Sequence, residues 1–445
     1  CSAASRSQTR SECFIRMSFK KNKSTHSRGY AQWGWIIGGR HYHVHTPCIG
    51  DRARAAPSAW SNVHRDSTVC GNPLLIAAAQ CGLQCHFFLT TPDDDLYLKY
   101  LGGYGLGAYY LYRWQKPGVD PLGPDNHLGF FSGLLTGTTA ITGNRYVVVA
   151  KSPKTNTWGD ANSGGTFGPA MKAAGFDAVV FRGISPSPVI LLLRDGQAEL
   201  LPGYAWWGLD CCEVDERARE EFGKNARAAC IGPAGEQQSL LSCIINDRGR
   251  AAGRSGLGAV MGAKRVKAIV AVGSAKPAMA DPEGMKEAIA RHREHLNRSA
   301  FTEHFRHYGT AGGTANCCVT GDSPIKNWAG VPDDFPTVSK ISDDAVLAIE
   351  RKKFGCWRCP IACGGHTVVD EGPYASDTHK PEYETLGAFG TLCLNDNLES
   401  IYLSNEICNR YGLDTISVGC AVAFAFECFE NGLITPQDTG GMELT

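Results

Sequence analysis

The sequence lacks a net charge, because 44 Lys and Arg residues balance 44 Asp and Glu residues over 445 positions. Proteins that bind nucleic acid or an anionic membrane surface usually carry an excess of basic residues. No apolar run approaches the ~18 residues of a membrane-spanning helix, and residues 417–429 are expected to form a buried helix instead. No signal-peptide pattern opens the chain. We therefore expect a cytoplasmic protein with no nucleic-acid partner and no membrane partner.

Two nucleotide-binding patterns are missing or incomplete. The phosphate-binding pattern G-x-x-x-x-G-K-[ST] is absent, which disfavours a P-loop NTPase. Residues 102–108, "GGYGLGA", contain G-x-G-x-x-A, but a helical segment precedes them where a dinucleotide fold needs a strand. A regular alternation of strands and helices is also missing. A nicotinamide-binding fold is therefore disfavoured.

Changes in composition divide the chain into three parts. Residues 1–90 show neither helical nor strand periodicity, so we assign them no function and expect them to be disordered or not genuine coding sequence. Residues 91–276 contain short β-branched runs bounded by Gly or Pro, which predict a β-rich domain. Residues 277–445 predict an all-helical domain, and Asp281-Pro282 marks the start of its first helix. The expected fold class is α+β.

Two glycine-rich loops, residues 145–168 and 246–264, are candidates for cofactor binding. Glycines let backbone N–H groups approach a phosphate or a flat ring closely, and arginine forks complete an anion site. The alternative is a pair of tight turns with solvated arginines. The candidate residues are Arg145, Asn162, Gly164, Gly165, Arg250, Ala251, Gly253 and Arg254.

The stretch "FGCWRCPIACGG" (354–365) places Cys356, Cys359 and Cys363 within eight positions. An iron–sulfur cluster takes four thiolates, commonly several from one loop and one from elsewhere. Zinc would usually present two separated pairs of ligands, and buried free thiols are a third possibility. The spacing favours iron–sulfur. Cys393, Cys408, Cys420 and Cys428 follow downstream, but three of the four lie in apolar helical patterns typical of a core.

These motifs together resemble the tungsten-containing aldehyde ferredoxin oxidoreductase family, from about residue 91 to about residue 437. The strings that carry the resemblance occur in family order: "YLGGYGLGAYYLY", "GLLTGTTAITGNRYVVVAKSP", "ANSGGTFG", "CIGPAGE", "INDRGRAAGRSGLGAVMGAK", "CWRCPIACGG", "PEYETLGAFG" and "NRYGLDTIS". The resemblance implies a β-rich pterin-binding base domain. It also implies a tungsten (or molybdenum) bis-pterin centre with Mg²⁺, a [4Fe–4S] cluster, a small aldehyde substrate, and ferredoxin as the electron acceptor.

The resemblance also implies roles for single residues. Arg145 would bridge a cofactor phosphate toward the cluster, and the carbonyls of Asn162 and Ala251 would hold the magnesium. Cys356, Cys359 and Cys363 would be cluster ligands. Glu384 would be a catalytic carboxylate near the metal, with a pKa that burial could raise. Asn409, which replaces a family Asp, and Asp414 would contact a pterin.

Departures from the family pattern qualify these expectations. The ligands of the family's dimer-interface metal are missing at residues 403–406, so a homo-oligomer is expected without that metal. The chain is expected to be a fragment, truncated at the C-terminus before the fourth cluster cysteine. Two alternatives to aldehyde oxidation stay open. One is the same cofactor acting on aromatic acyl-coenzyme A thioesters, and the other is an inactive fragment or a non-catalytic Fe–S electron-transfer protein.

Overall fold

The computed structural model describes residues 32–37, 40–45, 74–77, 82–88 and 95–444. The chain divides into two compact units, residues 1–59 and 60–445. The first unit contains an antiparallel hairpin of β1 (Gln32–Ile37) and β2 (Arg40–His45). Most other residues before 82 lie outside the described part of the chain, so the expectation of disorder stays a prediction there.

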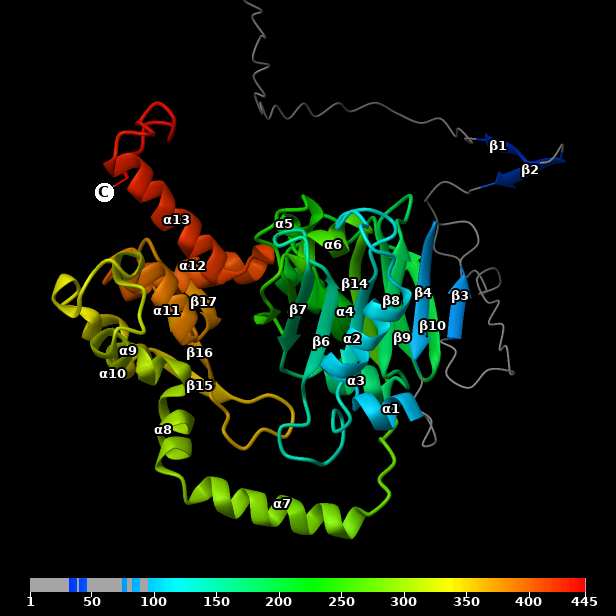
Figure 1. Cartoon of the computed structure of the whole chain (residues 1–445), viewed down its shortest axis with the longest axis horizontal. Coiled ribbons are helices and arrows are strands. Elements are labelled where there is room, and N and C mark those ends of the chain that lie inside the picture. The colour runs from blue at the N-terminus through cyan, green and yellow to red at the C-terminus, as the bar shows by residue number, and fades with distance from the viewer. Residues whose placement is uncertain (1–31, 38–39, 46–73, 78–81, 89–94, 445) are drawn as a thin grey trace, which may run out of the picture. The chain divides into compact units, whose positions relative to one another are not determined.

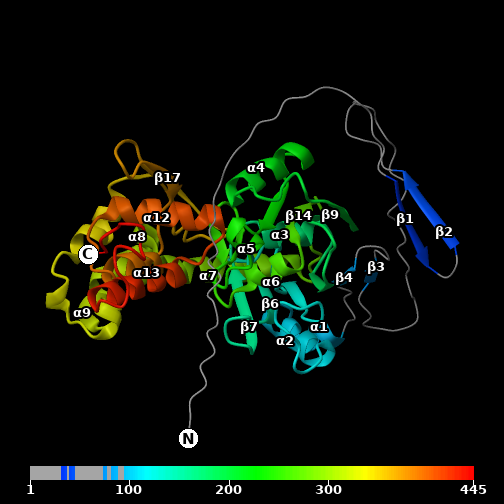
Figure 2. The ribbon, with the colours of Figure 1, turned by 90° about the horizontal axis from the view of Figure 1, so that it is seen from above.

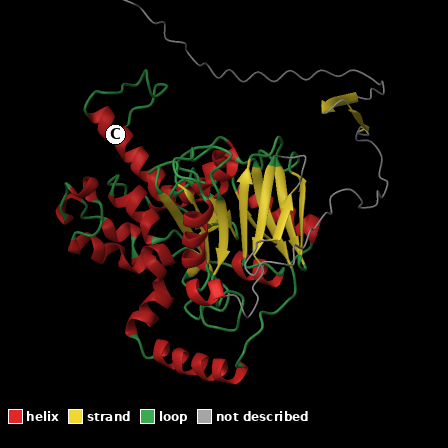
Figure 3. Ribbon diagram, turned by 45° about the vertical axis from the view of Figure 1, so that its right-hand side comes forward, coloured by secondary structure: helices red, strands yellow, loops and turns green. Residues whose placement is uncertain are grey.

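The first half of the second unit is built on two six-stranded sheets (Figures 1 and 3). The strand order of the first sheet is β3 (Leu74–Ala77), β4 (Leu83–Phe88), β8 (Ala178–Gly183), β5 (Leu128–Ser132), β6 (Tyr146–Lys151) and β7 (Trp158–Ser163). That of the second is β10 (Gln197–Pro202), β9 (Val189–Arg194), β14 (Val266–Val272), β11 (Arg227–Cys230), β12 (Ile244–Asn246) and β13 (Arg250–Ala252). Strands β9 and β14 pair in parallel and the other strand pairs of these two sheets are antiparallel, so the predicted β-rich, α+β character is confirmed.

The period-two alternation of the strands explains how the sheets pack in layers. Phe130 and Val148 point into the core between the two sheets, whereas Phe131 and Val147 point to the opposite face. Helices α3 (Phe167–Ala173) and α6 (Leu257–Ala263) contribute to the inter-sheet core, and α2 (Gly103–Trp114) and α4 (Cys211–Phe222) cover the outer faces. Figure 2 shows α2 and α4 on opposite sides of the strands. Two shorter helices complete this half, α1 (Asp95–Tyr100) and α5 (Pro233–Glu236).

The base sheets begin earlier than the sequence indicated. Strand β4 pairs with β8 along its whole length, and its Leu83 and Cys85 are fully buried in the inter-sheet core. The assignment of no structure up to residue 90 was therefore wrong for this strand. The sequence pattern did not predict this strand, because a short strand is stabilised mainly by its neighbours in the sheet and not by its own propensity.

The second half of the unit is rich in helices. They are α7 (Pro282–Asn297), α8 (Ala300–Tyr308), η1 (Gly309–Gly313), α9 (Thr314–Thr320), η2 (Ile325–Trp328), η3 (Pro332–Asp334), η4 (Val338–Ile341), α10 (Asp343–Leu347), α11 (Tyr383–Leu386), η5 (Gly387–Thr391), α12 (Leu398–Tyr411) and α13 (Thr415–Glu430). The predicted helix start is confirmed, since Asp281 Oδ1 accepts from Gly284 N–H at 2.8 Å. No helix in the described residues is long and apolar enough to cross a membrane.

Two expectations for this half were wrong. It is not all helical, because β15 (Glu350–Phe354), β16 (Gly364–Val369) and β17 (Ser376–His379) form an antiparallel sheet. The charged residues of β15 resemble the basic last turn of a helix, but charges equally suit an exposed edge strand. Helix α13 forms where predicted, yet it is not fully buried, because the side chain of Phe424 is 66% exposed.

Candidate functional site

The three closely spaced cysteines lie on the loop between β15 and β16, and backbone hydrogen bonds fix this loop to the base sheets. Trp357 N–H donates to the Gly165 carbonyl at 3.1 Å, and Asn144 Nδ2 donates to the Trp357 carbonyl at 3.1 Å. Thr142 N–H donates to the Arg358 carbonyl at 3.2 Å. Because successive backbone groups of the loop are paired with the base, the base positions the cysteines.

One cavity of about 510 Å³ brings the predicted motifs together. Cys356, Cys359 and Cys363 line it, so the thiols face a common space. The other predicted residues in its walls are Arg145, Gly164, Arg250, Ala251, Glu384, Asn409 and Asp414. We refer to this space as the cofactor cavity. Residues that are far apart in the sequence therefore meet at one place, as a shared cofactor site would require.

The remaining predicted residues adjoin the cofactor cavity without being part of its walls. Asn162 Oδ1 accepts from Arg145 Nη1 at 2.8 Å. Arg254 Nε lies 3.7 Å from Asp414 Oδ2, and a Cβ on Gly253 would lie 3.5 Å from the other Asp414 oxygen. Gly165 lines a neighbouring cavity that shares Cys356 and Arg250 with the first. Each of these residues is thus one contact from the cavity.

Gly164 shows why the first loop needs glycine. A Cβ at this position would lie 2.9 Å from Cys356 Sγ, so a larger residue would displace the thiol. Gly165 has a φ of +87°, and a Cβ there would lie 2.0 Å from Asp247 Oδ2. Gly164 therefore lets the first loop approach the cysteine loop, and Gly165 lets it approach the second glycine loop at Asp247.

Arg250 lies between the cysteines and an acidic residue. Its side chain is 13% exposed, its Nη1 donates to Glu382 Oε1 at 2.9 Å, and its Nε and Nη2 are buried with no partner among the described residues. Burial lowers the pKa of Arg250, but Glu382 and the thiols of Cys356 and Cys363 outweigh burial and keep that pKa above its ordinary value. A permanently charged guanidinium with two free donors fits an anionic group in the cavity.

The two glutamates of "PEYE" have different surroundings. Glu384 lines the cofactor cavity and its side chain is exposed, so this carboxylate is not desolvated by burial here. Glu382 lines the same cavity, pairs with Arg250 and accepts from Thr310 Oγ1 at 2.5 Å. Sequence reasoning missed Glu382, although the repeated acid in the string was a signal that either glutamate could face the site.

The C-terminal wall of the cofactor cavity comes from the junction of α12 and α13. Asn409 is buried near the end of α12. Asp414 is the N-cap of α13, and its Oδ2 accepts from Ser417 N–H at 3.1 Å and from Ser417 Oγ at 2.5 Å. The cap holds the Asp414 carboxylate at the cavity wall, which leaves Oδ1 on the side of Gly253.

Three further ionisable residues with little exposure to solvent were missed by sequence reasoning. His379 lines the cofactor cavity, its Nε2 has no partner among the described residues, and burial together with Arg250 lowers its pKa to about 4. Lys380 Nζ lies 2.8 Å from Glu350 Oε2, and both side chains are almost fully buried. Glu350 begins β15, His379 ends β17 and Lys380 follows it, and the sequence did not predict these strands. Their placement depends on the tertiary pairing of these strands.

These residues fit an iron–sulfur cluster better than a single metal ion. Within the described residues, no three His, Cys, Asp or Glu side chains converge where one ion could be held. In a [4Fe–4S] cluster each thiolate binds a different iron, so ligands stand further apart around a larger space. The three thiols, the close approach at Gly164 and the unpartnered donors of Arg250 fit a cluster beside a phosphate-bearing group.

A cavity lined by three thiols and by buried arginine donors can hold a redox cofactor. The family model described as "Aldehyde ferredoxin oxidoreductase, N-terminal domain" matches residues 87–273, and the one described as "Aldehyde ferredoxin oxidoreductase, domains 2 & 3" matches residues 287–445. The chain belongs to the aldehyde ferredoxin oxidoreductase family. The first match begins at residue 87, near the end of β4.

Individual relatives show the breadth of the family. A tungsten-containing aldehyde ferredoxin oxidoreductase from Pyrococcus abyssi is 40% identical over 357 residues, which are 79% of this chain and 58% of the relative. The WOR-like subunit of an aliphatic sulfonate oxidoreductase from Pyrococcus furiosus is 31% identical over 370 residues, 78% of this chain and 58% of that protein. This chain therefore spans less than two thirds of the length of these relatives.

A solved structure shows the same fold. The active-site complex BamBC of benzoyl coenzyme A reductase, in complex with 1,5-dienoyl-CoA, superposes with a TM-score of 0.64 and 26% sequence identity. The match covers 78% of this chain and 54% of that one. Most of the described chain therefore shares its fold with this reductase.

Proposed function

We propose that this chain carries the cofactor cavity of a tungsten enzyme that oxidises a small aldehyde to the carboxylic acid and passes the electrons to ferredoxin. The observation that carries the proposal is the single cavity lined by three cysteines, both arginine-bearing glycine loops and Glu384. We infer the metal, the substrate class and the electron acceptor from the names of the similar relatives. When bound, the tungsten bis-pterin and the [4Fe–4S] cluster would supply the oxidation and the electron transfer.

The chain's own residues would hold these groups. Cys356, Cys359 and Cys363 would bind iron, and the free Nε and Nη2 of Arg250 would donate to an anion on the cofactor. Arg145, oriented by its bond to Asn162, would contact a phosphate. The backbone carbonyls of Asn162 and Ala251, on strands β7 and β13, would hold Mg²⁺.

Glu384 would handle a proton of the reaction. Oxidation of an aldehyde with water releases protons, and a carboxylate at the mouth of the cofactor cavity can accept one and exchange it with solvent. Its exposed position supports such exchange, whereas Glu382 is held by Arg250 and Thr310. We therefore assign the proton-accepting role to Glu384 and a positioning role to Glu382.

The test combines metal analysis with an assay. The purified holoprotein is expected to contain iron, tungsten and pterin, and to reduce a viologen dye when an aldehyde is added. Cys359→Ser should lose iron and activity together, whereas Cys420→Ser, at an exposed position on α13, should retain both. Iron without tungsten or pterin would contradict the proposal and support a non-catalytic Fe–S protein.

A second candidate reaction is supported by the solved structure. The similarity to benzoyl coenzyme A reductase favours an aromatic acyl-CoA thioester as the alternative substrate class. The same holoprotein can be assayed for dienoyl-CoA formation with reduced viologen as electron donor. Aldehyde-dependent dye reduction without dienoyl-CoA formation would support the first candidate, and the reverse result would replace it.

Any homo-oligomer is proposed to form without the family's interface metal. Glu406 at the corresponding position is nearly buried, and its Oε1 accepts from Arg410 Nε at 2.5 Å. Asn405 Nδ2 donates to the His379 carbonyl at 2.9 Å. The Glu406 side chain is thus engaged within the chain, and Leu403, at the other ligand position, has no ligating atom.

A further inference from the structure

We infer that a second cavity, beside Trp357 and Arg358, is the docking site of an acidic electron-carrier protein. The inference rests on the proposed function, which supplies the electrons that the carrier would accept. This cavity measures about 390 Å³ and is distinct from the cofactor cavity. We refer to it as the carrier cavity.

The carrier cavity and the cofactor cavity lie on either side of the cysteine loop. Cys356 and Cys359 line the cofactor cavity, while the two residues between them, Trp357 and Arg358, line the carrier cavity. The backbone of Trp357 is therefore bonded directly to a residue that would bind the cluster. A protein bound at the carrier cavity would be separated from the cluster by the width of this loop alone.

The carrier cavity is basic although the chain as a whole is neutral. Its described wall contains Arg227, Lys276 and Arg358 and no Asp or Glu. Lys276 and Arg358 are exposed, and neither forms an ion pair in the part of the chain that the structure describes. Positively charged side chains without an ion-pair partner at a recess attract a protein that has carboxylates on its contact surface. This attraction increases the association rate.

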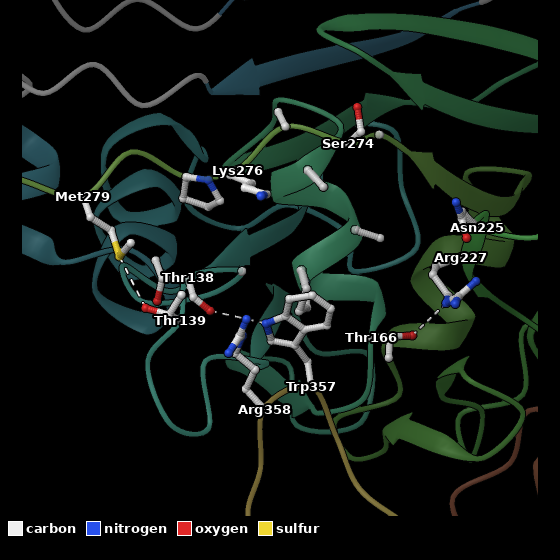
Figure 4. A pocket seen from close by; sticks show the side chains of 17 residues that line it. Thr138, Thr139, Thr166, Asn225, Arg227, Ser274, Lys276, Met279, Trp357 and Arg358 are labelled. Atoms are coloured by element: carbon white, nitrogen blue, oxygen red, sulfur yellow. Dashed lines mark hydrogen bonds between the residues drawn. The ribbon is translucent and has the colours of Figure 1, made fainter. Parts of the chain in front are cut away.

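Trp357 gives the carrier cavity a rigid aromatic anchor. Its ring is 39% exposed, its Nε1 donates to the Thr138 carbonyl at 3.4 Å, and the guanidinium of Arg358 lies 5.7 Å from the ring centre. Figure 4 shows the indole between Arg358 and the hydrogen-bonded pair of Thr166 and Arg227. Trp and Arg are enriched at the centres of protein interfaces, and a side chain fixed in advance loses little entropy on binding.

The carrier would accept one electron at a time, because the electrons would reach it through the cluster. Oxidation of one aldehyde with one water gives the carboxylic acid, two electrons and two protons. The electrons would leave through the cluster one at a time, so two oxidised ferredoxin molecules would be reduced for each aldehyde. Each would bind at the carrier cavity in its oxidised form and dissociate after reduction.

Calorimetric titration of the holoprotein with an oxidised, acidic [4Fe–4S] ferredoxin tests the docking site without requiring turnover. At low ionic strength, Lys276→Glu and Arg358→Glu should each weaken binding about tenfold. The difference from the parent should shrink at high salt, because salt screens exposed charges. Arg358→Lys keeps the charge and should bind like the parent. Circular dichroism checks that each variant is folded.

A matched control reverses a charge elsewhere. Lys116 is exposed and lines neither cavity, so Lys116→Glu should bind the ferredoxin like the parent. If both cavity variants bind like the parent, or if the parent does not bind, the docking site is disproved. Aldehyde-dependent viologen reduction is measured on the same proteins and should be equal in all of them. Its absence from the parent would refute the proposed function, while the titration would still decide on the docking site.

Discussion

Arg250 Nη1 lies 2.9 Å from Glu382 Oε1, and this pair joins the second glycine loop to the segment that carries Glu384. The guanidinium is buried and also lies over the Phe354 ring, 5.1 Å from its centre. Because Glu382 is the one acidic partner of this guanidinium among the described residues, the pair fixes both the charge and the orientation of a side chain that faces the cofactor cavity.

Glu382→Gln should destabilise the protein, because it removes the counter-charge of a buried guanidinium while preserving the shape of the side chain. We expect a loss of about 1–3 kcal/mol in the free energy of unfolding, measured by urea denaturation. Glu384→Gln is the matched control, the same change two positions away at an exposed residue, and should alter stability by less than about 0.5 kcal/mol. It should instead reduce the aldehyde-dependent rate. Equal stability of the two variants would refute the positioning role of Glu382.

Gly164→Ala should impair iron binding, because the added methyl group would lie 2.9 Å from Cys356 Sγ. The expected cost in stability is about 1–3 kcal/mol, typical of overpacking, together with a reduced iron content after reconstitution. Gly313→Ala is the control, because a Cβ there meets only Cys317 Sγ, at 3.9 Å. Full iron content in Gly164→Ala would show that the loop does not need this close approach.

The stability of the protein should fall in mild acid because of His379. Its pKa is lowered from 6.5 to about 4 in the folded protein, so the unfolded chain binds a proton that the folded one does not between these pH values. Stability from this residue is present above pH ~6.5 and decreases as the pH falls toward 4, by up to about 3 kcal/mol. Urea midpoints at several pH values measure the slope. His379→Gln should flatten it, and an unchanged slope would assign the effect to other groups.

Lys264→Met should stabilise the protein near neutral pH. Lys264 is fully buried, its Nζ donates to the Gly183 carbonyl at 3.1 Å, and burial lowers its pKa from 10.5 to about 7. The folded state therefore disfavours the charge that the unfolded chain carries up to pH ~10, and the wild-type protein should gain stability as the pH rises from 7 to 10. The apolar variant should be about 2 kcal/mol more stable at pH 7 and should lack this rise. Thermal melting of the wild-type protein and of the variant between pH 7 and 10 measures both differences.

Local patterns predicted the elements whose signals lie within a few residues. Asp281 caps a helix as predicted, and the cysteine and glycine motifs, each recognisable from its own spacing, line one cavity. The sheet of β15, β16 and β17 was missed because its strands are short and partly charged, so only their pairing stabilises them. The roles of Glu382 and His379 depend on neighbours such as Arg250, which lies 132 positions before Glu382, and no local pattern reports such a contact.

The bond between Asn144 and Trp357 joins residues 213 positions apart, and it has a consequence for the order in which the holoprotein matures. Contacts of such sequence separation form late in folding, because the intervening chain must first be ordered. The cysteine loop can take its final shape only after the base sheets present their surface to it. Iron insertion should therefore follow the folding of the β-rich half, and a nascent chain would hold its three thiols unprotected until that step.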